Sequence, residues 1–452
     1  MKFKKALCST LQFLKKETVL SIAAILAVVS AFFVPPSRGY LEYIDFRVLA
    51  LLYCLMLVVA GLQGIGVFRY LGDRLLRKVR STRQLSLLLV ALCFFSGMFI
   101  TNDVALITFV PFAVMVLTMA GQETLLIPVV VLQTIAANLG SMLTPIGNPQ
   151  NLYLYSAFEL PMGTFLLYML PLTAASALLL VLAVLFLKNH PLHTDAGSLS
   201  ASADSDDAPS CAPASRPQPF DSADSDDAPS HAPASRPQPF DGADPVDSPS
   251  PAPASRPQPS DGTEPGDGPA HAPAPQRPHR GKLAGYLLLF AVCLACVIRI
   301  LPWPVMLATL VVAVLILDRS LFAKADYFLL LTFVCFFLFI GNVGRIPAIA
   351  DFLRSFIEKR ELLLGVLLSQ FISNVPTAIL LSGFTENVRA LLYGVNVGGL
   401  GTLIASLASV ISFRLYGNSK GASKGAYVKA FTLYNVAFLL MLCGLAALLL
   451  AY

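Results

Sequence analysis

Long apolar runs separated by short polar segments make up most of the chain. Runs close to the roughly 20 residues that an α-helix needs to cross a bilayer lie near 18–35, 48–66, 163–187, 283–300, 303–318, 326–343 and 428–451. This pattern predicts an all-α polytopic membrane protein.

Four further apolar segments are interrupted by polar residues, Gly and Pro. We predict hairpins at 84–119 and 361–383, and broken helices at 124–155 and 386–413. For the two hairpin segments two interpretations stay open, a re-entrant hairpin or two short crossings. Neither choice changes the direction in which the remaining segments cross.

The segment 188–282 is polar and rich in Pro, Ala, Ser and Asp. Ser202–Asp221 is repeated almost unchanged in Ser222–Asp241. No copy has an apolar face to bury, so the pattern predicts a disordered linker rather than a solenoid. The expected organisation is an N-terminal membrane half (1–187), this linker, and a C-terminal membrane half (283–452).

Composition and charge agree with a membrane location. The chain is 56% hydrophobic and 13% charged, whereas soluble domains carry about 25% charged residues. Lys and Arg gather at the ends of the apolar runs, which argues against nucleic-acid binding. Their distribution predicts a cytoplasmic N-terminus and linker in a multi-pass protein of the plasma (inner) membrane.

The membrane segments lack the residues that several classes of chemistry require. All five histidines lie in or beside the linker, so the membrane segments offer no His proton relay, metal site or His-based triad. The chain has no phosphate-binding GxxxxGK[ST] motif. We therefore expect no enzyme, no metal and no cofactor, other than Na⁺ as a coupling ion.

The interrupted segments of the two halves match each other. Thr101-Asn102 corresponds to Ser373-Asn374, and the stretch Asn138–Asn151 aligns without gaps with Asn396–Ser409. Paired polar breaks in corresponding positions are the best sequence indication of a transporter's binding site. Backbone leaves the helix at membrane depth only where it lines a cavity or is buried in protein. An odd number of crossings between the copies would make the two repeats inverted.

Two alternatives stay open for these residues. Small polar residues also serve simply to pack helices together. Asp103, an acidic residue in the middle of an apolar run, is either an ion-coupling site or the cap of a half-helix starting at Val104. Its counterpart in the second half is the apolar Val375.

Three of these motifs resemble the ion transporter superfamily of arsenite/anion permeases, NhaD-type sodium–proton antiporters and citrate or dicarboxylate carriers. They are FFSGMFITNDVALITFVPF (Phe94–Phe112), NLGSMLTPIGNPQNLYLY (Asn138–Tyr155) and FISNVPTAILLSGF (Phe371–Phe384). The resemblance covers both membrane halves and skips the linker. It implies an elevator-type transporter with two inverted repeats.

The resemblance also implies the site residues. The hairpin-tip ligands would be Thr101, Asn102, Ser373, Asn374 and Thr377, and Asp103 beside the first tip is the candidate for coupling-ion binding. The unwound-helix ligands would be Asn138, Thr144, Gly147, Asn148, Asn396, Gly398, Gly399 and Thr402. Carboxylate carriers have Ser-Asn-Thr at both tips, which this chain lacks, and the difference favours the arsenite/anion permease and NhaD-like branches.

The resulting hypothesis is secondary active transport of a small anion, an arsenite-like oxyanion or a carboxylate, by alternating access. Coupling to Na⁺ or H⁺ is expected. The main alternative is an NhaD-type Na⁺/H⁺ antiporter, and a channel is a third, less favoured one. The expected partners are a small inorganic or organic anion, Na⁺ or H⁺ and the lipid bilayer, with homodimerisation left open.

Overall fold

Helices make up every element in the part of the chain that the structure describes. This computed structural model describes residues 18–68, 70, 74, 79–189, 280–419 and 421–451. Eight of the described helices are long and apolar enough to cross a membrane. The prediction of an all-α polytopic membrane protein is confirmed at this level. The predicted cytoplasmic N-terminus and nearly all of the linker lie outside the described residues.

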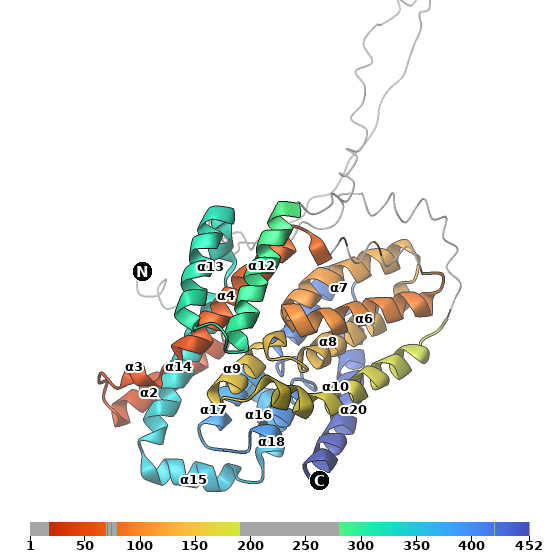
Figure 1. The fold of residues 1–452 in the computed structure, drawn as a ribbon. Helices are drawn as coiled ribbons and strands as arrows, with labels where there is room; N and C mark the ends of the chain where they lie inside the picture. Colours follow the sequence, from red (N-terminus) through yellow and green to blue (C-terminus); the bar gives the residue numbers. More distant parts are fainter. Residues whose placement is uncertain are drawn as a thin grey trace, which may run out of the picture. The chain divides into compact units, whose positions relative to one another are not determined.

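The bounds of the helices follow the apolar runs closely. The first half contains α2 (Thr18–Phe33), α3 (Tyr40–Tyr43), α4 (Phe46–Gly64), α6 (Thr82–Ile100), α7 (Asn102–Met119), η1 (Glu123–Leu125), α8 (Leu126–Ser141), η2 (Pro145–Gly147), α9 (Pro149–Ala157) and α10 (Met162–Leu185) (Figure 1). The second half contains α12 (Arg280–Val297), α13 (Trp303–Leu317), η3 (Arg319–Lys324), α14 (Tyr327–Gly344), α15 (Pro347–Ile357), α16 (Glu361–Ile372), α17 (Asn374–Ser382), α18 (Val388–Val397), α19 (Leu407–Gly417) and α20 (Lys424–Ala451).

The four interrupted segments are broken where the sequence predicts. Both hairpin segments divide into two helices, α6–α7 and α16–α17, each with a single residue between them. The segment 124–155 divides into α8 and α9, and the segment 386–413 divides into α18 and α19. Pro149 opens α9, where a proline costs no helix hydrogen bond.

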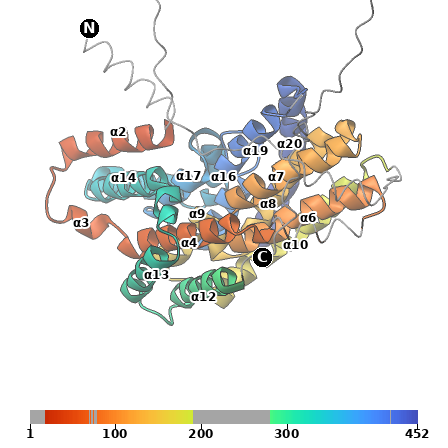
Figure 2. The same cartoon turned by 90° about the horizontal axis from the view of Figure 1, so that it is seen from above.

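The two repeats exchange partners when they pack. Each hairpin contacts the first part of its own broken helix, α6–α7 on α8 and α16–α17 on α18. The second part of each broken helix instead contacts the hairpin of the other half, α19 on α7 and α9 on α17. Figure 2 shows α19 beside α7. Each half therefore supplies a helix that packs on the hairpin of the other half.

The remaining long helices pair across the halves as well. Contacts join α2 with α14, and α4 with both α12 and α13. Large apolar side chains are left exposed on such helices, for example Phe32 on α2 (81%) and Ile316 on α13 (79%). Phe186, which directly follows α10, is also exposed (88%). In a chain with eight apolar helices, these side chains are suited to contact with lipid tails.

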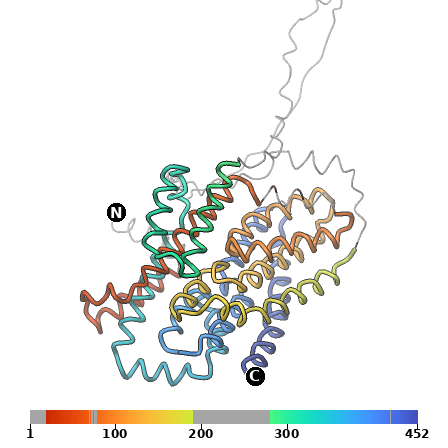
Figure 3. Tube along the Cα trace, in the orientation of Figure 1, coloured from red at the N-terminus to blue at the C-terminus, as the bar shows by residue number. Residues whose placement is uncertain are grey.

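The amphipathic helix α15 was not expected from the sequence. α15 lies in a stretch that the hydrophobic pattern assigns to an outside connection. Pro347 occupies its first turn, and its apolar residues fall on one face while Asp351 and Arg354 form an exposed ion pair of 3.5 Å. A short amphipathic helix escapes a search for long apolar runs because it spans only 11 residues and its polar positions interrupt the apolar ones. All described residues belong to one compact unit, whose Cα trace is drawn in Figure 3.

Candidate functional site

The two hairpin tips have the same unusual backbone. Thr101, between α6 and α7, has φ 70° and ψ 146°. Ser373, between α16 and α17, has φ 73° and ψ 157°. Such angles are strained for residues with a Cβ and concentrate at functional sites. The sequence match between the two tips therefore extends to the backbone.

A threonine of each broken helix is tethered near the tip of its own hairpin. The Thr144 hydroxyl donates to the carbonyl of Met98 over 2.5 Å. In the second half, the Thr402 hydroxyl donates to the carbonyl of Gln370 over 3.0 Å. Met98 and Gln370 hold equivalent places, three residues before each tip. The same bond is therefore made twice, once in each repeat.

The breaks of the two repeats are joined to each other by reciprocal hydrogen bonds. Asn148 Nδ2 donates to Asn396 Oδ1 over 3.2 Å. The Ser406 hydroxyl donates to Asn138 Oδ1 over 3.0 Å. In the gap-free alignment Asn148 corresponds to Ser406, and Asn138 corresponds to Asn396. Exchanging the two aligned segments therefore turns one bond into the other.

Asn151 completes the first of these junctions. Asn151 Oδ1 accepts a 2.7 Å hydrogen bond from Asn396 Nδ2. Asn151 Nδ2 donates to the backbone carbonyl of Met142 over 3.1 Å. Its backbone N–H donates to Asn148 Oδ1 over 2.9 Å, which caps α9. All of these asparagines are buried.

The first hairpin tip joins the same network through Asn102. Asn102 Nδ2 donates to Asn138 Oδ1 over 3.0 Å, and Asn102 Oδ1 accepts from the backbone N–H of Asp103 over 3.0 Å. Asp103 lies in the first turn of α7, whose cap position is Thr101. The interpretation of Asp103 as a cap is therefore wrong. Its Oδ1 is buried and has no hydrogen-bond partner among the described residues.

The second tip contacts the loop of its own broken helix. Both the Asn374 N–H (3.0 Å) and the Ser373 hydroxyl (3.4 Å) donate to the carbonyl of Ala405. The Thr377 hydroxyl donates to the carbonyl of Ser373, one turn back on α17. Of the predicted tip residues, Thr377 thus donates its hydroxyl hydrogen bond within its own helix rather than to the other half.

Gln370 organises the loop between α18 and α19, and it was not predicted. Its side-chain N–H groups donate to the carbonyls of Gly398 (2.9 Å) and Leu400 (3.0 Å), and its Oε1 accepts from the N–H of Thr402 (2.9 Å). Its counterpart in the first half is the apolar Met98, so the repeat comparison gave no signal for it.

The predicted glycines permit close backbone approach. A Cβ on Gly147 would lie 2.2 Å from the carbonyl oxygen of Ser141, and one on Gly398 would lie 2.6 Å from that of Gly394. A Cβ on Gly399 would lie 2.9 Å from Asn374 Nδ2. These glycines therefore contribute by letting neighbouring backbone and side-chain atoms approach closely.

The structure brings together Asn102, Asn138, Asn148 and Asn396 in one buried network, while Ser373, Asn374 and Thr402 surround the loop after α18. Asn151 and Ser406 take part in the buried network, although the sequence did not predict them as site residues. Their positions in the gap-free alignment were the sequence feature that could have identified them.

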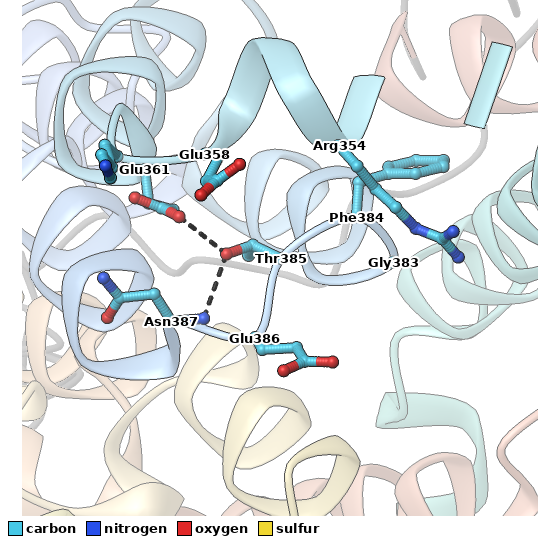
Figure 4. Close-up of a pocket in the computed structure, with 9 residues that line it drawn as sticks. Arg354, Glu358, Glu361, Gly383, Phe384, Thr385, Glu386 and Asn387 are labelled. Atoms are coloured by element: carbon cyan, nitrogen blue, oxygen red, sulfur yellow. Dashed lines mark hydrogen bonds between the residues drawn. The ribbon is translucent and has the colours of Figure 1, made fainter. Parts of the chain in front are cut away.

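A polar cavity lies away from these breaks. It has a volume of about 720 Å³ and lies at the start of α16, where the loop between α17 and α18 passes (Figure 4). Glu361 on its wall is buried and accepts a 2.8 Å hydrogen bond from the Thr385 hydroxyl. No predicted site residue lines this cavity.

Comparison with known proteins agrees with this architecture. The family model described as "Citrate transporter" matches residues 12–390. An uncharacterized transporter of Methanocaldococcus jannaschii is 25% identical over 82% of this chain and 81% of its own length. The inner membrane protein YbiR of Escherichia coli is 25% identical over 90% of this chain and 89% of its own length.

A shorter match links the chain to a plant protein. The silicon efflux transporter LSI3 of rice (Oryza sativa subsp. japonica) is 33% identical over 129 residues, which is 28% of this chain and 26% of that protein. The match to the family model covers most of the chain, and the chain therefore belongs to the citrate transporter family of membrane transporters.

Proposed function

We propose that this protein is a secondary active transporter that moves a small anion, an arsenite-like oxyanion or a carboxylate, across the plasma (inner) membrane. The observation that carries the proposal is the reciprocal pair of hydrogen bonds, Asn148 to Asn396 and Ser406 to Asn138. Two matched helix breaks that meet through polar side chains are typical of secondary transporters.

In this proposal the two halves, 1–187 and 283–452, are inverted repeats separated by a cytoplasmic linker at 188–282. The hairpins and broken helices, α6–α9 and α16–α19, form the moving transport domain of an elevator. The helices α2, α4 and α12–α14 form the scaffold. The exchange of α9 and α19 between hairpins supports motion of the eight helices as one body, because moving either hairpin alone would separate those contacts.

The substrate class rests on the chemistry of the breaks and on the relatives. Buried amides and hydroxyls recognise oxygen atoms by hydrogen bonds. The family name supports a carboxylate, while the name of the rice relative supports an oxyacid. The coupling ion would be Na⁺, bound by hydroxyl and carbonyl oxygens at the breaks, or H⁺.

The proposal is tested with the purified full-length chain in proteoliposomes. Uptake of arsenite, silicic acid, citrate, succinate and sulfate is measured with an imposed Na⁺ gradient, an imposed pH gradient, or neither. We expect saturable, gradient-driven uptake and counterflow for at least one of these solutes. Flux that never saturates would instead indicate a channel, and no flux of any solute contradicts the proposal.

An NhaD-type Na⁺/H⁺ antiporter is the second candidate, and Asp103 favours it. A buried carboxylate oxygen without a partner among the described residues is costly at membrane depth unless it binds an ion or a proton. Antiport predicts that Na⁺ added outside the vesicles alkalinises the lumen with no anion present, because Na⁺ enters in exchange for H⁺ that leaves. The Asp103→Asn variant should lose this exchange, and Asp103→Glu serves as its matched control.

A further inference from the structure

The reciprocity between the two repeats fails at one position. Asn396 Nδ2 donates to Asn151 Oδ1 over 2.7 Å. In the alignment the equivalent pair is Asn138 and Ser409. Asn138 is 5% exposed and Ser409 is 0% exposed, yet Asn138 Nδ2 and the Ser409 hydroxyl have no hydrogen-bond partner among the described residues.

The free atom of Asn138 is a donor, because its neighbours fix the orientation of the amide. The backbone N–H of Asp103 points at the Asn102 side chain, so that atom is the Asn102 oxygen. Asn102 therefore presents its Nδ2 to Asn138 and requires an oxygen there. A flipped Asn138 would place two NH₂ groups face to face.

The start of α19 lacks the cap that α9 has. Asn148 has two polar atoms, so it caps α9 with its oxygen and donates across the repeats with its nitrogen. Ser406 has a single hydroxyl, which donates to Asn138 and makes no cap on α19. Ser409 lies in the first turn of α19, so its hydroxyl sits at the positive end of an uncapped helix.

Asn138 Nδ2 and the Ser409 hydroxyl are both donors that could hydrogen-bond to an acceptor atom at the start of α19. Asn138 contacts Ser406, the cap position of α19, over 3.0 Å. Ser409 lies in the first turn of this 11-residue helix, and the start of a helix favours negative charge. In the first repeat the side-chain oxygen of Asn151 supplies the acceptor. Serine is shorter than asparagine, so at position 409 the acceptor must come from elsewhere.

We propose that Asn138 Nδ2 and the Ser409 hydroxyl form a buried subsite that binds one oxygen of the transported anion. The proposal rests on the proposed function and deepens it, because it assigns substrate recognition to one side of the pseudo-symmetric junction. The other side is closed by the bond between Asn396 and Asn151.

The deciding variant is Ser409→Asn, which rebuilds in the second repeat the acceptor that Asn151 provides in the first. Binding of arsenite, silicic acid, citrate, succinate and sulfate to the full-length protein is measured by thermal shift, and uptake is measured in proteoliposomes. For the solute that the wild type transports, we expect Ser409→Asn to weaken binding about tenfold or more, the loss of about 1.4 kcal/mol. The ligand-free variant should melt at or above the wild-type temperature.

Two further variants keep the test decisive if Ser409→Asn folds poorly. Ser409→Ala removes one donor without filling the space and should weaken binding several-fold. The control is Ser412→Ala. Ser412 lies one turn further along α19, where its hydroxyl contacts Thr134 and Tyr427, so its removal should leave binding unchanged.

Unchanged affinity in both Ser409 variants overturns the subsite, and a bound water then satisfies these groups. That result leaves the proposed function standing as long as the wild type transports one of the five solutes. If the wild type transports none of them, the proposed function fails and the subsite falls with it.

Discussion

The side chain of Asn148 donates a 3.2 Å hydrogen bond to that of Asn396, although 248 residues separate them in the chain. Both side chains are buried. Each belongs to the break of a different half, so this bond and its reciprocal, from Ser406 to Asn138, join the two halves at their interrupted helices. This buried polar network thus depends on both halves at once.

This junction predicts unequal effects of two substitutions at Asn148. Asn148→Leu removes the cap of α9 and leaves Asn396 Oδ1 without its donor, so we expect a loss of about 2–4 kcal/mol in the free energy of unfolding. Asn148→Ser places in the first half the residue found at position 406 and should cost clearly less. Denaturant unfolding in detergent measures both, and equal losses would contradict the assigned equivalence.

The hairpin tips should tolerate glycine. Thr101 has φ 70° and ψ 146°, a conformation that costs a residue with a Cβ about 1–3 kcal/mol. Thr101→Gly relieves this strain, and Thr101→Val keeps it while also removing the hydroxyl. We expect the glycine variant to melt at the higher temperature and both variants to bind anions equally weakly. A valine variant that binds like wild type removes the Thr101 hydroxyl from the site.

Close backbone packing makes Gly147 sensitive to the smallest side chain. Its Cβ would lie 2.2 Å from the carbonyl oxygen of Ser141, so Gly147→Ala must displace the turn between α8 and α9. We expect a loss of about 1–3 kcal/mol in stability together with reduced transport. Gly444→Ala is the matched control, since a Cβ there meets no atom within 4 Å. Thermal melting that is equally altered in both variants would contradict the tight contact.

The cavity beside Glu361 should serve stability rather than transport. Thr385→Val leaves the buried Glu361 carboxylate without its 2.8 Å hydrogen bond, which we expect to cost about 1.5–3 kcal/mol. Glu361→Gln keeps an acceptor for Thr385 and should cost less. Below their melting temperatures both variants should retain wild-type affinity for the transported anion. A selective loss of affinity in either one would show that this cavity belongs to the transport path.

The sequence alone determined where the helices break. Breaks are local events, since Gly and Pro and the polar residues beside them act within a few positions of the chain. For the same reason the apolar runs predicted the long helices, and the gap-free match between Asn138–Asn151 and Asn396–Ser409 predicted equivalent positions. The amphipathic helix α15 was missed because its polar residues hide it from a pattern of long apolar runs.

The partners of these residues were decided only by the tertiary structure. Nothing in either half shows that α9 packs on α17 and α19 on α7, because such contacts join segments more than two hundred residues apart. The tertiary structure also places Asn148 beside Asn396. Asn138 Nδ2 and the Ser409 hydroxyl are left without a hydrogen-bond partner among the described residues. Residue type and spacing were readable in the chain, but which donor meets which acceptor depends on packing.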